Sequence, residues 1–350
     1  MSLLIAQFQK FYPCQTYIFD KDHSMALMSV LLGGQHIDMV SPKSSGARIN
    51  PARRMLRNGH DRAFLKWIDV LLASNGTPLT GEDQETVSAA IQQMKSLGEH
   101  NWRLGTLYSL ISGSDKRLAI KIAPYVDRSD QEGSFAKGAF SEFFDHEDDS
   151  FSLGQIVCME TGKLLQSEQV AAPFMDYVFY CIDQQLDGQT PTLIYVEEAW
   201  YMLANPTFEE KVNDWLRTFR KKRAFVIFAT QSPEELRRLK AWPAFVANVP
   251  TRIFLPSIND SVSALTPIYR ELFNLNDAQL QLLSAAVPKR DYLIVKPGMT
   301  RLVEAQLPEV VIAINEGTTR REIRDAAFEL LEHGDGDWQI DFLTEKFHVG

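Results

Sequence analysis

The sequence predicts an α/β fold built on a mostly parallel sheet with helices on both faces. Short, nearly continuous apolar runs such as "LGQIVCME", "TLIYVEE" and "AFVIFATQS" alternate with longer amphipathic segments. Uninterrupted apolar strands are typical of parallel sheets that are buried on both faces, and the longer segments supply the covering helices. The 350 residues, of which 45% are hydrophobic and 23% charged, allow one large domain plus an insertion.

The first part of this core is predicted in residues 1–59. A helix is expected in "MSLLIAQFQKFY", where Leu3, Leu4, Gln7 and Phe8 fall near one helical face. A strand in "QTYIFDKD" ends in Asp20, and a second strand-like run lies in "HIDMVSPKS". A helix followed by strands fits the α/β class.

Residues 60–116 read as an inserted helical subdomain. "DRAFLKWIDVLLAS" and "TGEDQETVSAAIQQMKSLG" are amphipathic, and Thr80 is placed to cap the second helix. The following stretch, "APYVDRSDQEGSFAKGAFSEFFDHEDDS", is polar and rich in turn residues, so we expect a surface excursion.

The core is expected to resume within residues 117–315. Strands are predicted in "LGQIVCME", "TLIYVEE", "AFVIFATQS", "TRIFLPS", "DYLIVK" and two runs near "TRLVEAQLPEVVIAI". Helices are predicted in "EQVAAPFMDYVFYCIDQQLDG" and "FEEKVNDWLRTFRKK". Residues 316–350 are predicted to form a helical tail that faces solvent.

The amino-acid composition argues against several classes of function. A formal net charge of -9 argues against a dedicated nucleic-acid binder, although local basic faces remain open. Cys14, Cys158 and Cys181 are far apart and form no CxxC, so they indicate neither a zinc site nor a disulfide framework and fit a reducing cytosol. The apolar run "VAAPFMDYVFYCI" is broken by Asp176 and is shorter than the ~20 residues that span a bilayer.

Two adjacent carboxylates, Glu197 and Glu198, end the apolar strand "LIYVEE". In nucleotide hydrolases a carboxylate at such a strand end holds magnesium, and a neighbouring carboxylate orients and deprotonates the attacking water. The spacing puts Glu197 in the metal position and Glu198 in the base position. The alternative is a pair of solvated acids before a helix, whose N-terminus favours negative charge.

The next strand, "AFVIFATQS", ends in Thr230, Gln231 and Ser232. The carboxyl ends of parallel strands meet at one edge, where ligands bind. Gln231 carries both a donor and an acceptor and is therefore suited to contact a γ-phosphate or its water. The alternative is an ordinary polar strand end.

The helix between these strands carries a basic cluster toward its C-terminal end. Cations suit a helix C-terminus, so a solvated face is one interpretation. The functional interpretations are an arginine supplied across a subunit boundary, or a basic lip that faces nucleic acid or a partner. The cluster comprises Arg217, Arg220, Lys221, Lys222 and Arg223.

A phosphate-binding loop, G-x-x-x-x-G-K-[ST], is the expected other half of such a site. The only Gly-Lys pair is Gly162-Lys163, with Leu164 in the Ser/Thr position and Val157 in the first-glycine position, so we interpret it as a turn. No complete loop occurs in the 350 residues. Because "MSLLIAQFQKF" reads as the helix that follows such a loop, we expect the loop to precede Met1 and the chain to be truncated just after it.

Several stretches together resemble a known family. They are "LLIAQFQKFYPCQTYIFDKD", "SEFFDHEDDSFSLGQIVCMETG", "LIYVEEAWYMLANPTFEEKVNDWLRTFRKKRAFVIFATQS" and "VPTRIFLPS". In this order they resemble the ATPase domain of the conjugative-transfer and type IV secretion ATPases, the TrbE/VirB class.

The resemblance implies a RecA-like P-loop core that hydrolyses ATP with Mg²⁺ to power channel or pilus assembly and substrate transfer. It also implies a hexamer at the cytoplasmic face of the inner membrane. The expected partners are other secretion components, namely the coupling protein and inner-membrane channel subunits. The N-terminal domain that the family usually carries is not found in this sequence.

The resemblance also assigns roles to single positions. Glu198 matches the catalytic glutamate of the Walker B strand, and Glu197 stands where an aspartate is usual. Gln231 matches the sensor position. Arg217 and Arg220 match basic positions, one of which would act as a finger. Asp20 is expected either near the nucleotide or as a helix cap.

Without a phosphate loop, we expect the chain to bind ATP weakly. The sequence leaves two alternative functions open. In the first, the chain is a degenerate, non-hydrolysing structural subunit of the same machine. In the second, it is a DNA-translocating motor of the coupling-protein or FtsK type, and DNA is a partner.

Overall fold

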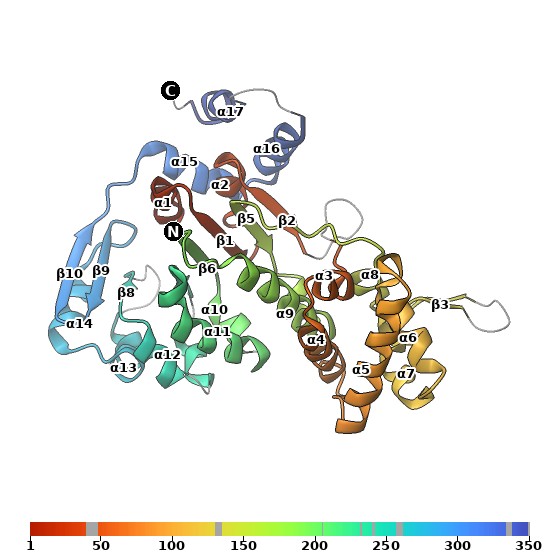
Figure 1. The fold of residues 1–350 in the computed structure, drawn as a ribbon. Coiled ribbons are helices and arrows are strands. Elements are labelled where there is room, and N and C mark those ends of the chain that lie inside the picture. The colour runs from red at the N-terminus through yellow and green to blue at the C-terminus, as the bar shows by residue number, and fades with distance from the viewer. Residues whose placement is uncertain are drawn as a thin grey trace. The chain divides into compact units, whose positions relative to one another are not determined.

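The computed structural model (Figure 1) describes residues 1–39, 48–129, 135–204, 206–231, 233–239, 242–256, 262–333 and 338–348. The chain divides into two compact units. The first unit comprises Met1–Ile18, His23–Gly33 and Gly188–Gly350, and the second comprises Phe19–Asp22 and Gly34–Asp187.

A five-stranded sheet has the strand order β2-β5-β1-β6-β7. β2 pairs with β5 and β6 pairs with β7 in parallel. Every residue of β5 and β6 is buried, as the apolar runs predict. The α/β class with a mostly parallel sheet is confirmed. The strands are β1 Gln15–Asp20, β2 Gln35–Asp38, β5 Ile156–Glu160, β6 Thr192–Val196 and β7 Ala224–Phe228.

The helices of the first unit include the one expected at the start of the chain. They are α1 Ser2–Phe8, α2 Ala26–Leu31, α10 Ala199–Leu203, α11 Pro206–Thr218, α12 Trp242–Asn248, α13 Val262–Phe273, α14 Asp277–Ala285, α15 Glu309–Thr318, α16 Arg321–His333 and α17 Trp338–Phe347. Short 3-10 turns are η1 Gln9–Phe11, η5 Phe219–Lys222 and η6 Pro233–Arg238.

The last strands of the first unit form a separate antiparallel sheet, β10-β9-β8, rather than extending the parallel sheet as we expected. Its strands are β8 Arg252–Phe254, β9 Asp291–Lys296 and β10 Met299–Glu304. Gly298 has φ 73° and closes the turn between β9 and β10, so these strands pair as a hairpin. A direct hairpin leaves no crossover helix, and the pairing is therefore antiparallel.

The second run in "TRLVEAQLPEVVIAI" is a helix, α15, and the prediction of a strand there was wrong. Pro308 is the N-cap residue and Glu309 lies in the first turn. Val311 and Ile314 are buried at helical spacing. These start signals outweigh the β-branched composition that favoured a strand.

The C-terminal helices belong to the first unit and bury one face within it, so the prediction of a tail that faces solvent was wrong. Trp338 and Phe342 of α17 and Ala327 of α16 join a buried cluster with Leu27 of α2 and Ile314 of α15. The fit is close at Gly317, where an added Cβ would lie 2.5 Å from Phe347 Cζ and 3.2 Å from Leu27 Cδ2. Their amphipathic pattern therefore marks a buried face.

The second unit is rich in helices, and α4 packs on α9 (Figure 1). Trp67 of α4 is fully buried and donates from Nε1 to the carbonyl of Pro173 inside α9 at 2.7 Å. The elements are α3 Pro51–Arg57, α4 Asp61–Ala73, α5 Gly81–Ser96, α6 Leu104–Ser112, α7 Lys116–Ile122, α8 Ser141–Phe144, α9 Glu168–Gln185, the short strands β3 Arg128–Ser129 and β4 Phe135–Ala136, and the 3-10 turns η2 Glu99–Asn101, η3 Ala123–Tyr125 and η4 Leu164–Gln166.

Thr80 caps α5, as predicted. Its hydroxyl accepts from Asp83 N at 3.2 Å, and the Asp83 carboxylate accepts from Thr80 N at 3.0 Å. The expected surface excursion after Ile122 was wrong in part, because Tyr125, Val126 and Phe144 are buried. Aromatic side chains within this polar stretch are therefore part of the hydrophobic core.

Candidate functional site

The carboxyl ends of β6 and β7 lie side by side. Val196 pairs with Phe228 in the parallel register. Beyond the strands, Ala229 N donates to Val196 O at 3.0 Å and Ala199 N donates to Ala229 O at 3.0 Å. These two backbone bonds hold the two strand ends together where Glu197 and Glu198 leave the sheet.

Glu198 lies in a left-handed backbone conformation, with φ 46° and ψ 49°, at the N-cap of α10. Its carboxylate accepts a hydrogen bond from Trp200 Nε1 at 2.7 Å, which fixes its orientation. A non-glycine residue in this region costs of order 1–3 kcal/mol and such residues cluster at functional sites. The neighbouring sequence, "VEEAW", contains no glycine or asparagine that would predict a left-handed backbone at this position.

Glu197 accepts a hydrogen bond from Ser24 Oγ at 2.5 Å. Ser24 lies between β1 and α2, in the turn that follows Asp20. Burial lowers the pKa of the Met1 amine, and the nearby charge of Glu197 counteracts part of this effect. Glu197 therefore faces the Ser24 turn and the start of α1. Sequence reasoning missed Ser24 because its partner is 173 residues away.

Gln231 follows the end of β7 and is exposed. The β6–β7 register puts it near the edge that carries Glu197 and Glu198. Ser232, the polar residue next to it in the predicted strand end, lies outside the described residues.

Arg217 and Arg220 lie at the other end of β7. Both are exposed, Arg217 at the end of α11 and Arg220 in η5, just before the strand starts at Ala224. A strand of five residues spans about 17 Å, so within one chain these arginines and Gln231 are at opposite strand ends.

Asp20 is fully buried at the end of β1. Its carboxylate accepts from Cys158 Sγ at 3.5 Å, and its carbonyl accepts from Thr161 N at 2.9 Å and Thr161 Oγ1 at 2.8 Å. The N-cap of the next helix is Met25, so Asp20 is not a helix cap. Gly162-Lys163 forms a turn before η4, as predicted.

The five-stranded, mostly parallel sheet and its helices give the chain an α/β fold. Two solved structures share the fold. VirB4 of Thermoanaerobacter pseudethanolicus has a TM-score of 0.60 and 17% identity over 88% of this chain and 85% of that one. The plasmid coupling protein TrwB, in complex with ADP and Mg²⁺, has a TM-score of 0.52 and 10% identity over 87% of this chain and 80% of that one.

Sequence comparison finds that the chain is similar to conjugal-transfer and type IV secretion proteins. The chain is 29% identical over 99% of its length to the conjugal transfer protein TrbE of Rhizobium radiobacter. It is likewise 29% identical over 99% of its length to a probable conjugal transfer protein TrbE of Sinorhizobium fredii strain NGR234. To the type IV secretion protein VirB4 of Bartonella quintana it is 26% identical over 91% of its length.

The chain spans 41%, 51% and 40% of the length of these three relatives, respectively. No family model matches it. The resemblance to the TrbE and VirB proteins is confirmed. Within the part of the chain that the structure describes, no helix has the length and hydropathy to cross a membrane.

Proposed function

We propose that this chain is the nucleotide-hydrolysing part of a conjugal-transfer or type IV secretion ATPase. The observation that carries the proposal is the similarity to TrbE over 99% of the chain, which includes the strand that ends in Glu197 and Glu198. In this role, ATP hydrolysis powers assembly of the channel or pilus and transfer of the substrate.

The residues around Glu197 fit a magnesium ion by their chemistry. Mg²⁺ prefers oxygen ligands and is usually held by one or two carboxylates together with substrate phosphates. Glu197 and Ser24 present a carboxylate and a hydroxyl that already lie 2.5 Å apart. Glu197 would hold the ion, and the Ser24 turn would keep the longer glutamate side chain in place.

Glu198 is proposed as the general base that orients and deprotonates the attacking water. The hydrogen bond that Trp200 Nε1 donates to the Glu198 carboxylate favours one orientation of that carboxylate. A fixed orientation supports the role of a general base. Gln231 is proposed to contact the γ-phosphate or its water from the neighbouring strand end. Asp20 is proposed to support the nucleotide side of the site by anchoring the end of β1.

Arg217 and Arg220 are proposed to serve a neighbouring copy, because they lie at the opposite end of β7 from Gln231. This assignment requires an oligomer, and we propose a hexamer. We further propose that it works at the cytoplasmic face of the inner membrane with the coupling protein and the inner-membrane channel subunits. Residues 60–116 are proposed to be an insertion in the ATPase core.

The sequence contains no complete phosphate loop, so the 350 residues should bind ATP·Mg²⁺ weakly. Calorimetric titration of ATP·Mg²⁺ into the chain and its Glu198→Gln variant tests the proposal. Weak binding without turnover is expected for both chains. Low-micromolar binding with turnover that Glu198→Gln leaves unchanged would overturn it.

A further inference from the structure

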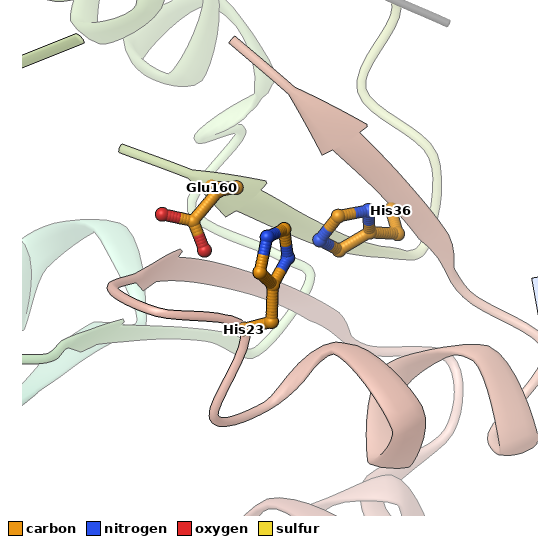
Figure 2. Close-up of side chains that lie close together, drawn as sticks. All are labelled: His23, His36 and Glu160. Carbon is orange, nitrogen blue, oxygen red and sulfur yellow. The ribbon is translucent and has the colours of Figure 1, made fainter. Parts of the chain in front are cut away.

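β7 stands at one end of the strand order of the five-stranded sheet, and in the part of the chain that the structure describes no strand pairs with its outer edge. β7 reads "AFVIF" and has no polar residue, whereas β2, at the other end of the order, reads "QHID". Figure 2 shows His36 on β2 and Glu160 on the neighbouring strand β5. Natural edge strands commonly carry charged residues that prevent further pairing, and β7 carries none.

The backbone of β7 alternates between its two edges. Arg223 O accepts from the backbone N of the first residue of β6 at 3.1 Å, and Ala229 N donates to the carbonyl of the last residue of β6 at 3.0 Å. In a parallel ladder, alternate residues of a strand pair with the same neighbour. The residues between these two bonds therefore form one set that faces β6 and one set that directs its N–H and C=O groups to the outer edge. The outward set is Ala224, Val226 and Phe228.

The side chains of β7 are less buried than those of β5 and β6. Only Ala224 is buried, and Phe225 is 44% exposed. Helices nevertheless reach both faces of the strand. The ring of Phe8 in α1 lies 5.1 Å from that of Phe225, and the ring of Phe245 in α12 lies 4.6 Å from that of Phe228. Because Phe225 and Phe228 are three residues apart, they lie on opposite faces, so the cover that β7 lacks is at its edge.

We propose that the outer edge of β7 binds one further strand of mainly apolar residues, which runs parallel to β7 and belongs to a segment of the protein outside these 350 residues. An extended segment that joins a sheet edge gains main-chain hydrogen bonds, and its alternate side chains pack on the two faces. The chain spans less than half of the length of TrbE of Rhizobium radiobacter and of VirB4 of Bartonella quintana, so these relatives carry sequence that can supply such a strand.

The parallel direction follows from the position of α1. Burial lowers the pKa of the Met1 amine, and the charge of Glu197 raises it in part, so α1 begins near the carboxyl end of β6. A strand that a short loop joins to α1 would end at this same edge and would run parallel to β7. In this respect the inference rests on the proposed function, since the loop would be the phosphate loop that the acidic edge needs.

Amide hydrogen exchange measured by NMR, without nucleotide, tests the proposal on a fusion protein. In the fusion, a strand of about five β-branched residues and a loop of the form G-x-x-x-x-G-K-[ST] are joined to Met1. The amides of Val226 and Phe228 should exchange rapidly in the 350-residue chain and at least ~10-fold more slowly in the fusion. The amides of Phe225 and Ile227 face β6 and should exchange slowly in both proteins.

Val226→Pro removes one outward N–H group and should prevent the added strand from pairing. Proline is tolerated where the N–H side of an edge strand faces solvent, so the variant should stay folded, which circular dichroism checks. The Phe228 amide should then exchange as rapidly in the Val226→Pro fusion as in the 350-residue chain. The matched control is Val226→Ile, which keeps the N–H group and should keep the slow exchange of Phe228 in the fusion.

Equal exchange rates for Val226 and Phe228 in the chain and the fusion would overturn the proposal. Slow exchange of these amides already in the 350-residue chain would also overturn it. In that case the edge is covered by the chain itself, or by a second copy if the protection increases with protein concentration. Because the measurement contains no nucleotide, its outcome does not depend on whether Glu198 catalyses hydrolysis.

Discussion

Ser24 donates a hydrogen bond to Glu197, which joins the turn after β1 to the acidic end of β6. The two residues are 173 positions apart in the chain. The contact places a hydroxyl directly on the carboxylate that we propose as the magnesium ligand. The position of this carboxylate therefore depends on a segment near the start of the chain.

Ser24→Ala should lower the free energy of unfolding by about 1–2 kcal/mol, because a partly buried carboxylate loses a hydrogen-bond donor. Urea denaturation measures the change. Ser24→Thr keeps the hydroxyl and should retain most of the stability. Equal stabilities for the wild-type and Ser24→Ala chains would show that the contact contributes nothing in solution.

Gly317→Ala should lower the free energy of unfolding by about 1–3 kcal/mol, because the added methyl overlaps Phe347 and presses on Leu27. The C-terminal helices should also become more sensitive to limited proteolysis. The control is Gly81→Ala at the start of α5, where an added Cβ meets nothing within 4 Å. If both variants behave alike, α17 does not pack as described.

Asp83→Asn should destabilise the protein at pH 7 by about 2 kcal/mol, because the neutral amide cannot form the ion pairs that the buried carboxylate forms. Hydrogen bonds from Arg117 and then Lys121 and Thr80 hold the pKa of Asp83 well below its usual value. Since the folded pKa is depressed, the carboxylate stabilises the fold above its unfolded pKa of about 3.9. This contribution is lost as the pH falls toward the lower, folded pKa.

The test is to measure the unfolding free energies of wild-type and Asp83→Asn chains from pH 7 to pH 3. The difference should be constant down to about pH 5 and shrink below about pH 4. A difference that stays constant to pH 3 would contradict the ionic role of Asp83.

Cys181 should resist alkylation in the folded protein. Burial raises the pKa of its thiol to about 12, and the thiolate is the reactive form. Mass spectrometry after iodoacetamide treatment at pH 8 should find Cys181 modified only in the presence of denaturant. Rapid native-state modification would show that α9 opens readily.

The strands of the parallel sheet could be predicted because each is an apolar run with a polar end. β5 and β6 are buried throughout, so local composition alone identified them. The pairing of β8, β9 and β10 could not be predicted, since it depends on which strands meet in space. α15 was misread because Val310, Val311 and Ile312 favour a strand locally, whereas the Pro308 and Glu309 start signals carry more weight.

The candidate site was predictable only in part for the same reason. Glu197, Glu198 and Gln231 stand out because they end apolar strands. Ser24 and the left-handed backbone of Glu198 are products of tertiary contacts.

The most direct test of the central claim is ATP hydrolysis by a fusion protein in which a phosphate loop of the form G-x-x-x-x-G-K-[ST] is joined to Met1. Turnover is expected to require Mg²⁺, and Glu198→Gln should reduce it by about 10²–10⁴-fold if Glu198 is the general base. Glu210→Gln, an exposed acid on α11, is the matched control and should leave turnover unchanged. Turnover that survives Glu198→Gln at the level of Glu210→Gln would contradict the assignment of the β6 edge as the catalytic half of an ATP site.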